Sequence, residues 1–259
     1  LESVRDSCDD IFVGEATRNE TLAGLCDGVD IVVSSLGLRT VRSRPTSEVV
    51  DLQANLNILE RACDAGVRQF VFVSVLHADQ LVKTVPILRP REDFVQRLQA
   101  SGLNWTVLRP TGAFNDMEEI FRLAKRGWGV VLGDGTHHIN PIHAADIATV
   151  AVRSLADPSM CNATLGFGGP ETYTQTEIVE LAFETLGACR RIVHVPPWVV
   201  DAAAAIVRPF NRNAAGFMKF FRRTATMEMV GIAVGEHSLA EFYRTLAREA
   251  MARSSRQSV

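Results

Sequence analysis

Long apolar runs are the first thing that this sequence lacks. No window approaches the roughly 18 uninterrupted apolar residues of a membrane-spanning helix, so we expect no membrane span. An excess of basic charge is also missing, since the formal net charge is −3, which argues against nucleic acid as a partner. The five cysteines show no CxxC spacing, which predicts reduced thiols in an intracellular compartment.

The start of the chain lacks two further features. The opening residues, LESVRDSCDD, contain neither an initiator Met nor a targeting pattern. We therefore expect a cytoplasmic location, with organellar targeting left open because the N-terminus looks incomplete.

What the sequence does contain is an alternation of short β-branched runs and helical patterns. Helical stretches that end in Gly28 and Gly66 separate the apolar runs, as in βαβ units. After Pro110 the pattern changes toward helices, which predicts a main domain over residues 1–157 and a smaller, dependent lobe over residues 158–259. Four strands are expected in the first domain: Asp10–Val13, Asp30–Ser34, Gln69–Val75 and Asn104–Leu108.

Three stretches occur in a characteristic order between about residue 9 and about residue 157. They are GEATRNETLAGLCDGVDIVVSSLG, NLNILERACDAGVRQFVFVSV, and SGLNWTVLRPTGAF followed by GDGTHHINPIHAADIA. Together they resemble the NmrA-like, atypical branch of the short-chain dehydrogenase/reductase superfamily. The resemblance implies an α/β fold: a Rossmann-like, doubly wound parallel sheet with a smaller, mostly helical C-terminal lobe.

The resemblance also implies a cofactor, NADP or, less favoured, NAD. Relatives begin with a strand, a GxxGxxG turn and a helix, and the turn holds the diphosphate; this sequence has no such turn. Either the N-terminal β-α-β portion is missing from a fragment, or the chain is a degenerate relative. We favour the fragment, because the remaining strands are too apolar to stay half uncovered.

Two groups of residues near the first strands are expected to contact the cofactor. Glu15 and Ala16 match the place of an adenine-binding carboxylate, with a plain helix cap as the alternative. Small residues let a backbone approach an adenosine closely, although an ordinary turn would use them too; here they are Ser34, Ser35, Leu36 and Gly37.

Catalytic candidates follow the third strand. By the resemblance, Ser74 would orient a substrate carbonyl, and Ser74 and Val75 would line the cofactor. Arg91 stands where relatives often have a Lys, so it could hold a ribose or phosphate but not donate a proton; the alternative is a solvated surface residue. The YxxxK pattern is absent, since the only tyrosines are Tyr173 and Tyr243.

The nicotinamide side is expected to be lined by the loop after the fourth strand. Its candidate residues are Pro110, Thr111, Gly112 and Phe114, with a core aromatic as the alternative for Phe114. A metal site at His137, His138, His143 and Asp146 is disfavoured, because His143 with Asp146 fits a helix start.

Two functions remain open from the sequence. The first is an NAD(P)-dependent oxidoreductase acting on a small organic substrate. The second is a non-catalytic dinucleotide sensor or assembly factor with a protein partner or as a homodimer, favoured by the missing Tyr and by Arg91. Basic residues among aromatics, as in FNRNAAGFMKFF, could mark a membrane or RNA surface, but a solvated helix face is favoured by the net acidic charge.

Overall fold

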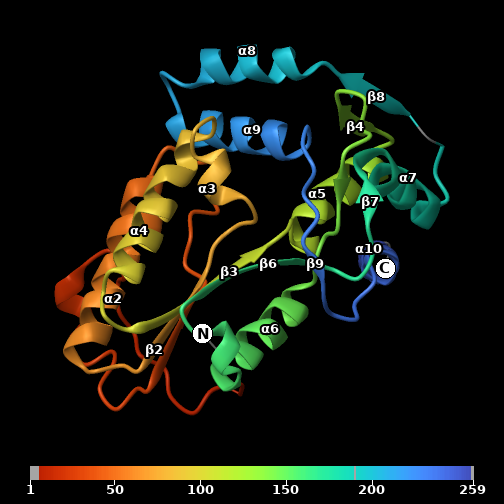
Figure 1. Ribbon diagram of the computed structural model, residues 1–259. Coiled ribbons are helices and arrows are strands. Elements are labelled where there is room, and N and C mark those ends of the chain that lie inside the picture. Colours follow the sequence, from red (N-terminus) through yellow and green to blue (C-terminus); the bar gives the residue numbers. More distant parts are fainter. Residues whose placement is uncertain (1–5, 190, 258–259) are drawn as a thin grey trace.

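The computed structural model describes residues 6–189 and 191–257, and a central parallel sheet organises them (Figure 1). All four strand pairings are parallel, so the carboxyl ends of the strands meet at one edge. The strand order is β1 (Ile31–Ser34), β2 (Gln69–Val73), β3 (Asn104–Pro110), β6 (Ala163–Gly168) and β9 (Ile232–Ala233).

Helices cover both faces of this sheet, which is why its strands are apolar on both sides. Phe70 and Phe72 of β2 pack toward one face, while Val71 between them packs toward the other. The first face is covered by the π-helical segment η2 (Glu48–Ala54), by α2 (Asn55–Asp64) and by α4 (Arg89–Gln99). The opposite face is covered by α6 (Ala144–Ala156).

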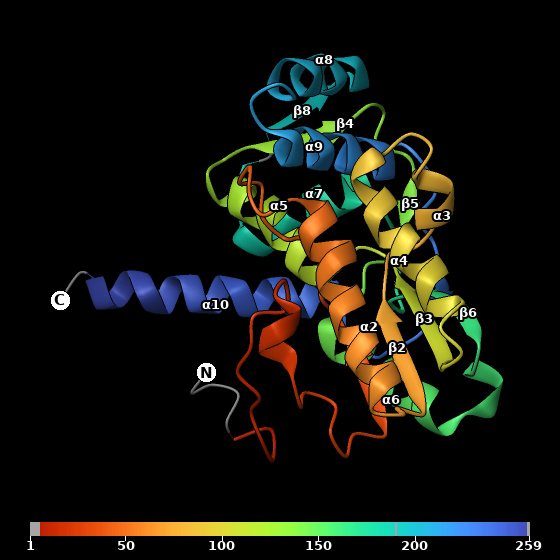
Figure 2. The same ribbon diagram turned by 90° about the vertical axis from the view of Figure 1, so that its left-hand side faces the viewer.

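A second core lies beside the sheet, with buried Phe114, Phe183 and Tyr243 at its centre. Its elements are α5 (Phe114–Lys125), α7 (Gln175–Leu186), α10 (Leu239–Gln257) and the parallel pair β4 (Gly129–Leu132) and β8 (Ile192–Val195). Helices α8 (Pro197–Val207) and α9 (Arg212–Thr224) pack on each other above it (Figures 1 and 2).

The remaining elements are short. They are η1 (Asn19–Leu22), α3 (Ala78–Leu81), η3 (Pro86–Leu88), η4 (Pro158–Met160) and the antiparallel pair β5 (His138–Ile139) and β7 (Tyr173–Thr174). None of the helices in the described part of the chain is long and apolar enough to cross a membrane.

The predicted α/β parallel sheet is confirmed, and three of the four expected strands lie close to where they were predicted. The strand predicted at Asp10–Val13 is wrong: this segment is irregular, and the Val13 side chain is 77% exposed. Sheet formation needs a neighbour, and within residues 6–189 and 191–257 no strand pairs with the outer edge of β1.

The helix expected in NETLAGLCDG is only the single turn η1. Gly24 has a φ of +80° and Gly28 a φ of +72°, so two left-handed residues interrupt this segment. In contrast, the long helix expected before Gly66 is present, and Gly66 ends it with a φ of +70°.

The predicted division at residue 157 needs correction. Strands β6 and β9 both follow residue 157, yet they complete the main sheet. The chain therefore passes between the sheet and the second core several times, and the two cores are built from interleaved segments.

The contact between α4 and the sheet gives a stability test. Leu98 is fully buried among Phe70, Phe94 and Val107, so Leu98→Ala should lower the free energy of unfolding by about 2–5 kcal/mol. Gln96→Ala, on the exposed side of the same helix, is the matched control and should change it by less than about 0.5 kcal/mol. Urea unfolding measures both, and equal effects would contradict this packing.

Candidate functional site

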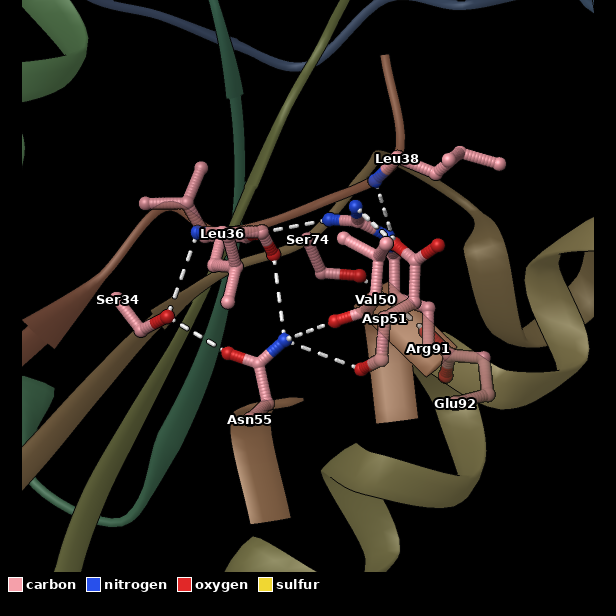
Figure 3. Close-up of polar contacts among 10 residues, drawn as sticks. Ser34, Leu36, Leu38, Val50, Asp51, Asn55, Ser74, Arg91 and Glu92 are labelled. Atoms are coloured by element: carbon pink, nitrogen blue, oxygen red, sulfur yellow. Dashed lines mark hydrogen bonds and ion pairs between the residues drawn. The ribbon is translucent and has the colours of Figure 1, made fainter. Parts of the chain in front are cut away.

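Polar side chains gather at the carboxyl ends of β1, β2 and β3 in two networks; Figure 3 shows the first of them together with Ser74 and Glu92 of the second. Ser34 ends β1, Ser74 follows β2, and Arg109 lies near the end of β3. In open parallel sheets this edge is where ligands bind.

Asn55 ties the loop after β1 to the helix beneath it. Its side-chain oxygen accepts a hydrogen bond from the Ser34 hydroxyl at 2.7 Å. Its amide donates to the carbonyls of Leu36 at 3.3 Å, Val50 at 3.3 Å and Asp51 at 3.1 Å. The buried side-chain amide of Asn55 thus fixes the loop after β1, which carries several of the predicted cofactor residues.

Arg91 lies inside this network, so the alternative of a solvated surface arginine is wrong. Its guanidinium forms an ion pair with Asp51 at 2.5 Å and donates to the Val73 carbonyl at 3.0 Å. It also lies over the Phe72 ring, 5.6 Å from the centroid. The two charged side chains are only 12% and 5% exposed, so this is a buried structural pair.

Gly37 makes room for that arginine. A Cβ at this position would lie within 1.8 Å of Nη2 of Arg91 and 3.2 Å from Oδ1 of Asp51. The absence of a side chain at Gly37 is therefore explained first by the ion pair.

A second buried network starts at Ser74. Its hydroxyl donates to Oε1 of Glu92 at 3.3 Å, and the other oxygen of Glu92 pairs with Arg109 at 2.6 Å. Arg109 also pairs with Asp79 at 2.5 Å. Ser74 is 3% exposed, so its hydroxyl is engaged within the protein.

The two buried carboxyls depend on their arginines. Burial raises the pKa of Asp51, and the guanidinium of Arg91 opposes that rise. Burial likewise raises the pKa of Glu92, with Arg109 opposing. Removing either arginine would leave a carboxyl with no charged partner in a buried place, which is costly.

A groove of about 650 Å³ runs along the unpaired edge of β1. Its apolar wall includes Leu25, Val29 and Ile58, and Arg39 stands exposed at its rim. Among the predicted cofactor residues it is lined by Ala16, Ser34, Ser35, Leu36 and Gly37.

The other predicted adenine contact, Glu15, is engaged locally. Its carboxylate accepts hydrogen bonds from the Thr17 hydroxyl at 2.7 Å and the Thr17 N–H at 3.4 Å. These hydrogen bonds lower the pKa of Glu15. Glu15 thus stabilises the turn that it belongs to, but it is not the helix cap of the alternative, because the N-cap of η1 is Arg18, whose side chain makes no capping hydrogen bond.

The residues predicted for the nicotinamide side are packed into the protein. Thr111 is buried and donates to the Asn140 carbonyl at 2.5 Å, and a Cβ on Gly112 would meet Ile139 at 3.0 Å. Phe114 is a core aromatic, 1% exposed and in contact with the rings of His143 and Phe242.

Pro110 and Val75 are also part of the packing. Pro110 is buried at the end of β3, where its carbonyl accepts a hydrogen bond from the N–H of Leu76. Val75 packs against the small cluster around Leu81.

Neither tyrosine is placed as a proton donor for this edge. The Tyr243 hydroxyl donates to the Met117 carbonyl at 3.0 Å inside the second core, and burial raises the pKa of Tyr243. Tyr173 bonds to Glu171, and burial together with that carboxylate raises the pKa of Tyr173.

The histidines form no metal centre. Throughout the described ranges, no group of three His, Cys, Asp or Glu side chains is placed to hold a metal ion. His143 instead caps α6, because its Nδ1 accepts a hydrogen bond from the Ala145 N–H at 3.2 Å. Asp146 pairs with His237 at 2.8 Å.

Four residues of these networks were not predicted from the sequence: Asp51, Asn55, Glu92 and Asp79. A signal for the first two was present, since Asp51, Asn55, Leu59 and Ala62 follow a helical spacing and all four are buried. Polar residues inside an apolar helical stripe indicate buried polar contacts. Nothing local marks Glu92 or Asp79, because their partner, Arg109, is brought to them only by the fold.

This arrangement defines the class: an α/β protein with a parallel, Rossmann-type sheet, polar side chains at the carboxyl edge and a groove along β1. A family model described as NAD(P)H-binding matches residues 1–158, and the chain belongs to this family, within the extended short-chain dehydrogenase/reductase superfamily.

Similarity to individual proteins is lower but extends over most of the chain. The chain is 26% identical over 205 residues to the photosystem II assembly factor Ycf39 of Synechocystis sp., covering 78% of this chain and 61% of that protein. It is 28% identical over 228 residues to the chloroplastic divinyl chlorophyllide a 8-vinyl-reductase of Oryza sativa subsp. indica, covering 78% and 56%. The chain thus spans about three fifths of the length of these relatives.

A solved structure shares the fold. The NADPH complex of the quinone oxidoreductase QOR2 from Escherichia coli superposes with a TM-score of 0.70 at 16% identity. The match covers 95% of this chain and 86% of that one, and it shows the fold alone.

The buried pair of Arg91 and Asp51 gives a first prediction for this site. Arg91→Ala should lower the free energy of unfolding by about 3–5 kcal/mol, because it leaves Asp51 buried without its partner. Arg97→Ala, an exposed arginine on the same helix, is the matched control and should cost less than about 0.5 kcal/mol. If urea unfolding gave the same small loss for both, Arg91 would not be a structural residue.

His143 gives a prediction for pH. Burial lowers the pKa of His143 below its ordinary value of 6.5, and only the neutral ring can accept the hydrogen bond from Ala145. A lowered folded-state pKa gives stability that is present above the ordinary value and lost as the pH falls through the folded-state value.

His143→Asn keeps a cap that does not titrate, so the variant should lose less stability than the wild type on acidification. Urea midpoints measured at about pH 8 and about pH 5.5 compare the two proteins. Identical pH dependence in both would show that the ring does not act through its neutral form.

Proposed function

We propose that the protein binds NADP(H), or less favourably NAD(H), along the β1 groove and acts as a dinucleotide-responsive assembly or regulatory factor. The carrying observation is that Arg91 and Ser74, which would serve catalysis, are both engaged in buried networks. A side chain that is held by three protein contacts is not free to hold a ribose.

The groove residues fit one half of a dinucleotide. A sugar and a base could approach the backbone closely where the side chains are small, at Ser34, Ser35 and Gly37. The apolar wall of Leu25 and Ile58 lines the same groove. Arg39, exposed at the rim, is suited to a phosphate. A bound nicotinamide would supply or accept a hydride. The polar residues at the ends of β2 and β3 bond to other protein groups and stabilise the fold.

The assembly role is supported by the Ycf39 relatives, whose names describe photosystem II assembly factors. A partner would then be a protein, and occupancy of the groove would change its affinity. The chloroplastic name of the rice relative favours the organellar alternative over the predicted cytoplasmic location.

A reductase remains the second candidate, and the rice 8-vinyl-reductase relative supports it. Its substrate would be a small organic molecule that meets the nicotinamide at the ends of β2 and β3. That function requires a proton source other than Tyr173 and Tyr243, since both are bonded away from this edge.

The experiment measures binding and turnover in one preparation. Calorimetric titration with NADPH should show binding, and Arg39→Ala should weaken it about tenfold by removing a charged hydrogen-bond donor. Ser35→Phe should block the groove, whereas Val152→Phe, on the exposed side of α6, is the matched control and should bind as the wild type does.

NADPH absorbance in the presence of quinones and vinyl- or carbonyl-containing acceptors tests turnover. We expect binding without acceptor-dependent oxidation. Oxidation that is lost in Ser35→Phe would replace the regulatory proposal with the reductase. Absence of NADPH and NADH binding would contradict both.

A further inference from the structure

Helix α8 is apolar on two opposite faces but is covered on only one. Its inner side packs on α9, with Ala204 buried between them. Its outer side carries Trp198, Ala202, Ala205 and Ile206, which share a helical spacing and are all exposed. Figures 1 and 2 both show α8 as the outermost helix at one end of the molecule.

The exposed side chains are large. Phe210 is 83% exposed, Ile206 71% and Trp198 69%, and Phe210 is the most exposed large apolar side chain in the described residues. An apolar helix face is normally covered by a protein core, by a partner or by a membrane. A contiguous apolar surface of this kind marks a docking site.

The charge around this face selects the occupant. Phe210 stands in the turn RPFNR between α8 and α9, where Arg208 and Arg212 bracket it and both are exposed. Of the five Arg or Lys side chains in residues 197–224, Arg208 and Arg212 are exposed, whereas Arg222 pairs with Asp201 at 2.9 Å. The apolar outer face of α8, with cations on both sides of Phe210, complements a surface that is anionic outside and apolar inside.

A second copy of the chain fits this face less well. A two-fold contact centred on Phe210, the most exposed apolar side chain of this face, would bring Arg208 and Arg212 of one copy toward the same residues of the other. Like charges would then be placed together in an apolar contact, which is unfavourable.

We propose that the outer face of α8, with the Arg208–Arg212 turn, docks the protein on an anionic lipid bilayer. Phe210, Ile206 and Trp198 enter the boundary between headgroups and acyl chains, while Arg208 and Arg212 contact lipid phosphates. The helix lies along the surface and does not span it, in agreement with the absence of a spanning helix in the described residues. This docking does not depend on the proposed dinucleotide binding.

Vesicle sedimentation of the full chain tests the proposal. The protein should bind vesicles of phosphatidylcholine with phosphatidylglycerol, bind pure phosphatidylcholine more weakly, and be released by salt. The triple variant Trp198→Ser, Ile206→Ser, Phe210→Ser should lower the partition coefficient at least about tenfold. Val152→Ser and Val13→Ser, exposed apolar residues away from α8, are the matched controls.

Two further measurements separate the occupants. Arg208→Glu with Arg212→Glu should abolish the preference for phosphatidylglycerol, whereas Arg97→Glu should keep it. Tryptophan emission should shift to shorter wavelength on vesicle addition, and Trp198→Phe should lose that shift.

Several outcomes overturn the proposal. They are absence of binding to both vesicles, unchanged binding of the triple variant, and a dimer in sedimentation velocity that the triple substitution disperses.

Discussion

The buried ion pair between Arg91 and Asp51 is the constraint on which this edge of the fold depends. It joins the start of α4 to η2, and the bond from Arg91 to the Val73 carbonyl adds the end of β2. Gly37 leaves the space that the Arg91 side chain occupies. Asn55 ties the loop after β1 to η2 through the carbonyls of Leu36 and Asp51. A charge pair out of water must be fully satisfied to be tolerated, which explains why so many neighbours serve it.

The consequence is that Ser74 and Arg91, the catalytic candidates expected from the family resemblance, are both engaged within the protein. Two adjacent residues of α4 contact two different strand ends. Arg91 bonds to the end of β2, and Glu92 pairs with Arg109 near the end of β3 and accepts a hydrogen bond from Ser74. The groove beside β1 stays open, with small residues and Arg39 around it. Under the proposed function, binding and chemistry would therefore be separated, because the groove is open while the polar groups beside it are engaged within the protein. The outer face of α8 is formed by other residues than the groove, so the proposed dinucleotide binding and the proposed membrane docking would use different surfaces.

The sequence predicted the parts of the fold that depend on local patterns. Strand β3 was expected at Asn104–Leu108 and extends to Pro110, and Gly66 ends its helix as its position indicated. It failed where partners from elsewhere decide. Asp10–Val13 has the composition of a strand but no neighbour to pair with in the described chain, and β9, two residues long, joins the sheet only through β6. Arg91 was singled out by resemblance, yet its role followed from Asp51, forty residues away in sequence. Phe114 was equally consistent with a ligand wall and a core, and only packing decides between them.

A double-mutant cycle on Arg91 and Asp51 tests the central claim most directly. Urea unfolding would be measured for the wild type, Arg91→Met, Asp51→Leu and the double variant. The account predicts that the double variant is more stable than the sum of the single losses allows, with a coupling of at least about 1 kcal/mol. Losses that add within about 0.5 kcal/mol would contradict it, because Arg91 would then be free for a ligand.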